Sequence, residues 1–317
     1  MLGNQVTVFG ATGYVGREVV NELSKAGYQV TVVVRRPERF REFALYPNTK
    51  LFTLDSFDDS AQLKASMKNS QIVFNLLVDR STGTEMIEKD ELGDVARKLK
   101  SAMESDHIQR VMSLSFLGAN NDCDSHEWLG VLGECDNQMH GVACADETIF
   151  RVGLLIGAND EVTSKYVNQL NRMSVLPVVN GSISVQPLWV KDFAKAMVAS
   201  IENTALFGKK IEVAGTEDLM VKELGSMIAS LMGKEDAVIF PMCKLNAKLM
   251  TLFGPLAPVA SIAKSQFTLL QNDATTATDF AETFGFQPSS LEKVLTQYAV
   301  PKVQRKKYND FRKVANR

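Results

Sequence analysis

The sequence has few of the residues that build metal sites and disulfide frameworks. Its 317 residues include four cysteines and three histidines, and none of these forms a CxxC or HExxH motif. No metal site is therefore indicated, and the cysteine usage favours the cytoplasm or an equivalent reducing compartment. No apolar run reaches the roughly 18–20 residues of a membrane span. The first residues lack the basic and apolar regions of a leader, so we expect a soluble protein or one peripheral to a membrane.

The sequence also lacks a strong overall charge, but the charge it has is unevenly spread. Residues 302–317 carry seven basic side chains and one acidic side chain, so the rest of the chain has a formal charge of −8 within a total of −2. A basic tail is typical of a solvated terminus, of contact with an anionic membrane surface, or of nucleic-acid binding. No RNA-binding motif accompanies the charge, so we expect no nucleic acid as a partner.

What is present is an alternation of strand-like and helical patterns. Short β-branched or apolar runs alternate with segments of helical spacing, and this order is typical of a parallel sheet covered by helices on both faces. The fold class predicted is α/β, a Rossmann-type doubly wound parallel sheet. The strands are expected at 5–10, 29–34, 50–54, 71–78, 109–116 and 147–152, and the helices at 14–26, 58–68, 86–105 and 126–140.

The alternation becomes irregular after about residue 155. Helices are expected at 164–176, 190–201 and 218–232, and a strand at 209–214. We therefore predict a dinucleotide-binding core at 1–155, a smaller C-terminal lobe at 156–299 that completes the fold and covers the cleft, and a basic tail at 300–317. Residues 245–263 are apolar with two prolines, which is consistent with a helical cover over the cleft or with a surface for a lipid or membrane.

The strongest chemical signal is a glycine pattern between the first strand and the first helix. Gly10, Gly13 and Gly16 form GxxGxxG: the first allows a tight turn, the second lets a pyrophosphate approach the backbone, and the third allows close helix–strand contact. The following helix presents N–H groups and a positive dipole end to phosphate. The remaining contacts expected in this turn are Thr12, Tyr14 and Val15.

The second strand ends in two arginines. A site for NAD usually has Asp or Glu here, which accepts hydrogen bonds from the adenosine ribose, whereas Arg35 and Arg36 suit a 2′-phosphate. NADP(H) is therefore favoured over NAD(H), with Arg35 as the preferred contact. Other strand ends supply further expected cofactor contacts: Asp55, Ser56, Asn75, Leu76, Leu77, Ser113 and Leu114.

Several motifs together resemble a known family. The turn GATGYVGR, followed by SVLPVVNG at 174–181, VQPLWVKDFAKAM at 185–197 and GKKIEVAG at 208–215, resembles the extended, atypical branch of the short-chain dehydrogenase/reductase superfamily. Within that branch the chain is similar to the dehydrogenase-like accessory subunit of respiratory complex I and its bacterial relatives. The resemblance extends over about residues 4–299 and implies a dinucleotide-binding fold linked to a respiratory or quinone-related membrane assembly.

Active members of that superfamily use a Tyr-x-x-x-Lys pair with an upstream serine, in which the lysine lowers the tyrosine pKa for proton transfer. Ser115 matches the serine, but Trp128 and Leu132 stand at the tyrosine and lysine positions. Neither side chain performs acid–base chemistry at neutral pH. Cys123, Asp124, His126 and Glu127 are nearby substitutes, and most of them read more simply as helix-start or surface residues.

Three functional hypotheses follow. The first is a protein that retains NADP(H) as a structural or sensing ligand without turnover, with Ser115 as a vestige of the catalytic group and with a membrane surface or membrane-complex partner bound through 245–263 and the tail. The second is an NADPH-dependent oxidoreductase that acts on a quinone-like or other small apolar acceptor without the Tyr/Lys pair. The third is a basic-tailed RNA-binding protein.

Overall fold

The computed structural model describes residues 3–77, 91–104, 108–120, 127–143, 145–243, 246, 262 and 266–300. A seven-stranded sheet forms its centre, in the order β11-β6-β5-β4-β1-β2-β3, and every pairing in it is parallel. This confirms the Rossmann-type doubly wound sheet. The strands are β1 (Gln5–Phe9), β2 (Gln29–Val34), β3 (Thr49–Thr53), β4 (Ile72–Asn75), β5 (Arg110–Phe116), β6 (Asp146–Val152) and β11 (Lys209–Val213).

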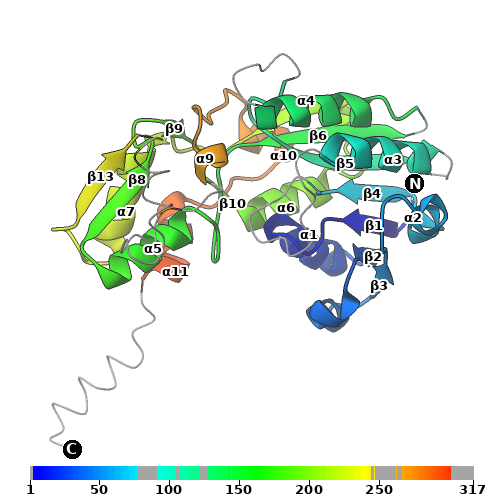
Figure 1. Ribbon diagram of the computed structural model, residues 1–317, viewed down its shortest axis with the longest axis horizontal. Coiled ribbons are helices and arrows are strands. Elements are labelled where there is room, and N and C mark those ends of the chain that lie inside the picture. The colour runs from blue at the N-terminus through cyan, green and yellow to red at the C-terminus, as the bar shows by residue number, and fades with distance from the viewer. Residues whose placement is uncertain are drawn as a thin grey trace, which may run out of the picture.

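Helices cover both faces of this sheet (Figure 1). On one face lie α1 (Tyr14–Lys25) and α6 (Val190–Ala199), where the ring of Phe193 packs edge-on at 6.1 Å from that of Phe150. On the other face lie α2 (Ser60–Met67), α3 (Leu92–Glu104) and α4 (Glu127–His140). Strands β1, β4 and β5 are almost entirely buried, because in a parallel sheet helices exclude water from both faces.

A second cluster of elements lies beyond the carboxyl edge of the sheet, on the left of Figure 1. Its hydrophobic core is separate from that of the sheet and includes Tyr166, Leu176, Ile228 and Leu295. The elements are β7 (Leu155–Ile156), α5 (Thr163–Arg172), β8 (Val175–Val179), β9 (Ser184–Val185), β10 (Leu188–Trp189), β12 (Leu219–Met220), α7 (Val221–Leu231), β13 (Val238–Met242), α9 (Gln266–Leu269) and α11 (Leu291–Ala299). Helix α10 (Phe280–Phe284) instead packs on the core of the sheet, where the ring of Phe284 lies 6.4 Å from that of Phe150.

One fully buried arginine joins α6 to the sheet. The guanidinium of Arg110, at the start of β5, donates to the carbonyl oxygens of Ser200 and Ile201 just beyond α6, at 3.2 and 3.0 Å. It also donates to Thr148 Oγ1 at 2.7 Å and lies 4.2 Å from the ring centroid of Phe207. Burial lowers the pKa of Arg110 to about 10, and the bonds it donates offset the cost of burying the charge.

Two segments end differently from the prediction. The helix expected at 164–176 ends at Arg172, since residues 175–179 form β8, which pairs in parallel with β13. The strand expected at 71–78 ends at Asn75. The apolar segment 245–263, apart from residues 246 and 262, and the basic tail 302–317 lie outside the described residues. In the part of the chain that the structure describes, no helix is long and apolar enough to cross a membrane.

Candidate functional site

The glycine turn connects β1 to α1 at the carboxyl edge of the sheet. Gly10 has a φ of +76°, and a Cβ there would lie 2.4 Å from the carbonyl oxygen of Leu76. A Cβ on Gly16 would lie 2.3 Å from the carbonyl oxygen of Gly10. Both contacts are far shorter than atoms tolerate, so only glycine fits at these two positions. The turn is thereby held close to β4 and to the start of α1.

The start of α1 has the features of an anion site. Gly13 is the N-cap, and no side chain bonds to the first turn from that position. The Gly13 N–H donates to Gly10 O at 3.1 Å, which closes the turn directly below the helix. The positive end of the helix dipole therefore faces the carboxyl edge of the sheet, where a pyrophosphate binds in dinucleotide folds. Thr12, Tyr14 and Val15 are buried in this turn.

The end of β2 carries Arg35 and Arg36, and both are exposed. No acidic side chain follows the strand until Glu38, which lies in the 3-10 helix Pro37–Arg39. The electrostatic character of this strand end is therefore cationic, which suits a phosphate better than a ribose hydroxyl.

The residues expected beyond β3 are engaged in local contacts. The Asp55 N–H donates to Gln62 Oε1 at 2.8 Å, and Gln62 Nε2 donates back to Asp55 Oδ2 at 3.3 Å. The Ser56 hydroxyl donates to Asp58 Oδ2 at 3.1 Å. These bonds shape the start of α2, so the structure gives Asp55 and Ser56 a role in the loop.

The ends of β4 and β5 bring Asn75 and Ser113 side by side as register partners. Both are buried, and Asn75 Oδ1 accepts a 3.4 Å hydrogen bond from the Leu77 N–H. The Ser113 hydroxyl has no hydrogen-bond partner among the described residues. Leu76 and Leu114 are buried, and Leu77 is partly buried. A buried hydroxyl without a partner, beside a turn that only glycine can form, fits a dinucleotide at this edge.

The positions of the missing acid–base pair lie on α4. Trp128 is partly buried and Leu132 is completely buried, so neither offers a proton-transfer group. Ser115 is also completely buried, and its hydroxyl has no hydrogen-bond partner among the described residues. It lies near the Asp136 carboxyl, two helical turns beyond Trp128, and so borders a buried contact beneath α4 that sequence reasoning did not foresee.

Asp136 is the centre of that buried contact. Its carboxylate accepts a 2.8 Å bond from Arg151 Nε on β6. Burial raises the pKa of Asp136, while Ser115 and Arg151 act in the opposite direction. Leu132 separates Asp136 from Trp128 along the same face of α4, so this carboxyl does not take the place of the missing tyrosine.

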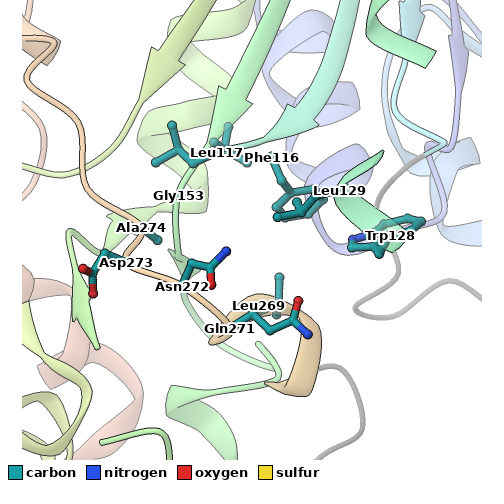
Figure 2. A pocket seen from close by; sticks show the side chains of 11 residues that line it. Phe116, Leu117, Trp128, Leu129, Gly153, Leu269, Gln271, Asn272, Asp273 and Ala274 are labelled. Atoms are coloured by element: carbon teal, nitrogen blue, oxygen red, sulfur yellow. The ribbon is translucent and has the colours of Figure 1, made fainter. Parts of the chain in front are cut away.

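A cleft lies next to Trp128, as Figure 2 shows. It encloses about 430 Å³, open solvent included. One wall is apolar and comes from the carboxyl ends of β5 and β6 and the start of α4; the other comes from the segment after α9. The lining residues are Phe116, Leu117, Trp128, Leu129, Val152, Gly153, Leu269, Gln271, Asn272, Asp273 and Ala274.

Cys123, Asp124 and His126 lie outside the described residues, as does the side chain of Glu127. Among the residues that are described, no group of three or more His, Cys, Asp or Glu side chains could hold a metal ion. Sequence reasoning missed Arg17, which lies between the glycine turn and the segment after β2. Its place directly after the third glycine is the only signal that could have pointed to it.

Comparison with known families identifies the first part of the chain. Residues 10–148 match the family described as NAD(P)H-binding. This part of the chain is an NAD(P)H-binding domain. The match begins at Gly10 and extends through β2, β3, β4 and β5 into β6, so it includes the glycine turn and the carboxyl ends of β2, β3, β4 and β5.

Relatives extend the similarity over most of the NAD(P)H-binding chain. It is 27% identical to mitochondrial NADH dehydrogenase (ubiquinone) 1 alpha subcomplex subunit 9 of Arabidopsis thaliana, over 86% of this chain and 70% of that protein. The subunit of the same name from Rattus norvegicus is 24% identical, over 92% of this chain and 78% of that protein. The resemblance to the accessory subunit of complex I is thus confirmed.

Solved structures show the same fold at lower identity. An Escherichia coli NADPH-dependent quinone oxidoreductase complexed with NADPH has a TM-score of 0.72 and 16% identity, over 92% of this chain and 99% of that one. The Citrobacter triphenylmethane reductase complexed with NADP(H) has a TM-score of 0.73 and 16% identity, over 92% of this chain and 99% of that one. These likenesses show that the chain shares the fold of these two proteins.

Proposed function

We propose that this protein binds NADP(H), in preference to NAD(H), as a structural or sensing ligand that is not turned over. The observation that carries the proposal is an intact glycine turn in a chain that has Trp128, in the wall of a cleft, and the buried Leu132 at the positions of the acid–base pair. Bound NADPH supplies a hydride, but a carbonyl acceptor also needs a proton donor. Trp128, Leu132 and the buried Ser115 provide none.

The proposed cofactor contacts are the residues of the turn and the strand ends. Gly10, Thr12, Gly13, Tyr14, Val15 and Gly16 would cradle the pyrophosphate, and Asn75, Leu76, Leu77, Ser113 and Leu114 would line the ribose and nicotinamide side. Arg35 and Arg36 would meet the 2′-phosphate. Asp55 and Ser56 remain as the proposed adenine side.

The cofactor preference is tested by the affinity of the purified protein for NADPH and NADH. We expect NADPH to bind at least about tenfold more tightly, because a charge-assisted hydrogen bond to phosphate is worth about 1.5–3 kcal/mol. Replacing Arg35 by Met should remove most of that difference and leave NADH binding unchanged. Equal affinities of the wild-type protein for both nucleotides would contradict the preference.

The proposed setting is a respiratory or quinone-related membrane assembly in a reducing compartment. Its support is the name of the relatives, which are subunits of a mitochondrial NADH dehydrogenase. Residues 245–263 and 302–317 are proposed as the segments that meet a membrane surface or a membrane-complex partner. We also propose the division into a core at 1–155, a lobe at 156–299 that completes the fold, and a tail at 300–317. The place of β11 at the edge of the sheet supports the lobe's part in completing the fold.

A second function is an NADPH-dependent reductase of a small apolar acceptor such as a quinone. The cleft beside Trp128 favours it, because a flat apolar acceptor could lie against the indole, with the polar side chains of Gln271 and Asn272 on the opposite wall. Hydride transfer to such an acceptor needs less help from a side-chain acid than carbonyl reduction does.

Occupation of this cleft can be read from tryptophan fluorescence. The chain has only two tryptophans, Trp128 and Trp189, so Trp189→Phe leaves Trp128 as the sole reporter. If the cleft takes a planar acceptor, 1,4-naphthoquinone should quench this variant saturably, while the matched Trp128→Phe variant should show only collisional quenching. Identical, linear quenching in both variants would remove the reductase alternative.

A further inference from the structure

Arg17 is held in one position by contacts with two parts of the chain. It lies in the first turn of α1, and its Nε donates to the carbonyl oxygen of Thr12, in the glycine turn, at 3.0 Å. One terminal nitrogen forms a 2.5 Å ion pair with Glu42 Oε1. The guanidinium carbon lies 5.9 Å from the ring centroids of both Phe40 and Phe43. The guanidinium therefore lies between the glycine turn and the segment that follows β2.

This location borders the place where a dinucleotide fold receives the adenosine ribose. In such folds the ribose lies between the first glycine turn and the end of the second strand. Arg35 and Arg36 belong to the strand side of that place, and Arg17 belongs to its helix side. Arg39 and Arg41 follow in the same segment and are exposed. Glu38 and Glu42 lie in the same segment, so the adenosine end of the site keeps an excess of positive charge, and Glu42 pairs with Arg17.

Arg17 can exchange the carboxylate of Glu42 for another anion. Both side chains are about 40% exposed, and ion pairs at such exposure are screened by water. A phosphate carries up to twice the charge of a carboxylate and has three acceptor oxygens, so it bonds a guanidinium more strongly than Glu42 does. The ribose hydroxyl of NAD(H) carries no charge and gains little from Arg17.

We propose that Arg17 is a second recognition residue for the 2′-phosphate of NADP(H), and that Glu42 occupies it when the phosphate is absent and competes with the phosphate for it. The inference rests on the proposed NADP(H) preference and adds that Glu42 sets the strength of this preference. Glu42 orders Arg17 for binding and at the same time lowers the affinity for the phosphate, so the residue at position 42 sets how strongly the protein distinguishes the two nucleotides.

Adenosine 2′,5′-bisphosphate and adenosine 5′-monophosphate test this without any catalytic readout, since they differ only in the 2′-phosphate. Their dissociation constants are measured by calorimetry for the full chain and for Arg17→Met, Glu42→Gln and the double variant. Glu22→Gln is the matched control, because Glu22 forms a 2.6 Å ion pair with Lys25 farther along the same helix. It changes the net charge equally without touching Arg17.

Arg17→Met should weaken binding of the bisphosphate about tenfold and that of the monophosphate less than about twofold. Glu42→Gln should strengthen binding of the bisphosphate about threefold, and Glu22→Gln should change neither constant. In the double variant the gain from Glu42→Gln should vanish, because the residue for which Glu42 competes is gone.

The inference is overturned if Arg17→Met weakens both ligands equally, because Arg17 then only supports the glycine turn. It is also overturned if Glu42→Gln weakens binding of the bisphosphate. A wild-type protein that does not distinguish the two ligands contradicts the NADP(H) preference alone. In that case a Glu42→Gln variant that gains discrimination still supports the competition, and one that gains none refutes it.

Discussion

At the residue scale, the nucleotide site depends on positions where any side chain would collide with the backbone. Gly10 combines a left-handed φ with a carbonyl oxygen 2.4 Å from the position of an added Cβ, and that oxygen belongs to Leu76 on the neighbouring strand end. The collision cannot be relieved by rotating a side chain. Any residue other than glycine must therefore move β1, the turn or β4, which together form the floor of the site.

Gly10→Ala should lower the free energy of unfolding by more than about 2 kcal/mol and abolish measurable NADPH binding, since it adds a backbone collision to left-handed strain. Gly27 is the matched control. Its φ is +85°, but an added Cβ would meet nothing within 4 Å, so Gly27→Ala carries only the conformational cost of about 1 kcal/mol. Denaturant unfolding and nucleotide titration of both variants check this; equal losses in the two would mean that the close approach to Leu76 is unimportant.

Sequence reasoning can point to single residues only where the chemistry is local. The glycines, and the arginines at 35 and 36, could be read directly because each lies at a recognisable strand end. Arg17 could not, because its meaning comes from Glu42, which is 25 residues away. The surroundings of Ser115 were equally hidden: the nearby Asp136 forms an ion pair with Arg151, which lies on another strand.

At the element scale, the sheet and its helices assemble through a few contacts between distant segments. Arg110 is the clearest, because one guanidinium at the start of β5 satisfies the carbonyl groups that end α6, 90 residues later. These carbonyls have no partner within their own helix. The arginine thus fixes where α6 lies against the sheet.

Arg110→Lys should cost about 2–4 kcal/mol of stability, because an ammonium cannot supply the planar set of donors and leaves buried carbonyl oxygens unsatisfied. The comparison is Arg97→Lys, which alters a 65% exposed side chain in an i,i+3 pair with Asp94 and should change stability by less than about 0.5 kcal/mol. Urea denaturation measures both. A loss for Arg110→Lys no greater than that for Arg97→Lys would show that α6 is held by apolar packing alone.

The elements of the core could be predicted because β-branched strands and amphipathic helices alternate regularly there. The lobe could not be predicted as well. The segment 174–181 contains Pro177 and Asn180, which weaken a strand pattern, and β8 becomes a strand only because β13, some 60 residues on, pairs with it. Non-local pairing of this kind leaves no periodic signal, so the predicted helix ran on into β8.

At the scale of the whole molecule, a nucleotide-binding sheet and a separate lobe meet at the carboxyl edge of the sheet, and the cleft lies between them (Figures 1 and 2). The cleft lies where the superfamily resemblance predicts a substrate, yet Trp128 forms part of its wall. The fold of reductases is thus present with Trp128 and Leu132 at the positions of the Tyr/Lys pair. This combination is the reason to propose retention of NADP(H) without turnover.

The most direct test follows the absorbance of protein-bound NADPH at the wavelength of the reduced nicotinamide, over hours, with and without 1,4-naphthoquinone. We predict that NADPH stays bound and reduced, and that any loss matches the rate in buffer and in a Gly10→Ala control that does not bind it. Oxidation that exceeds both controls and scales with protein concentration would contradict the account and establish the protein as a working reductase.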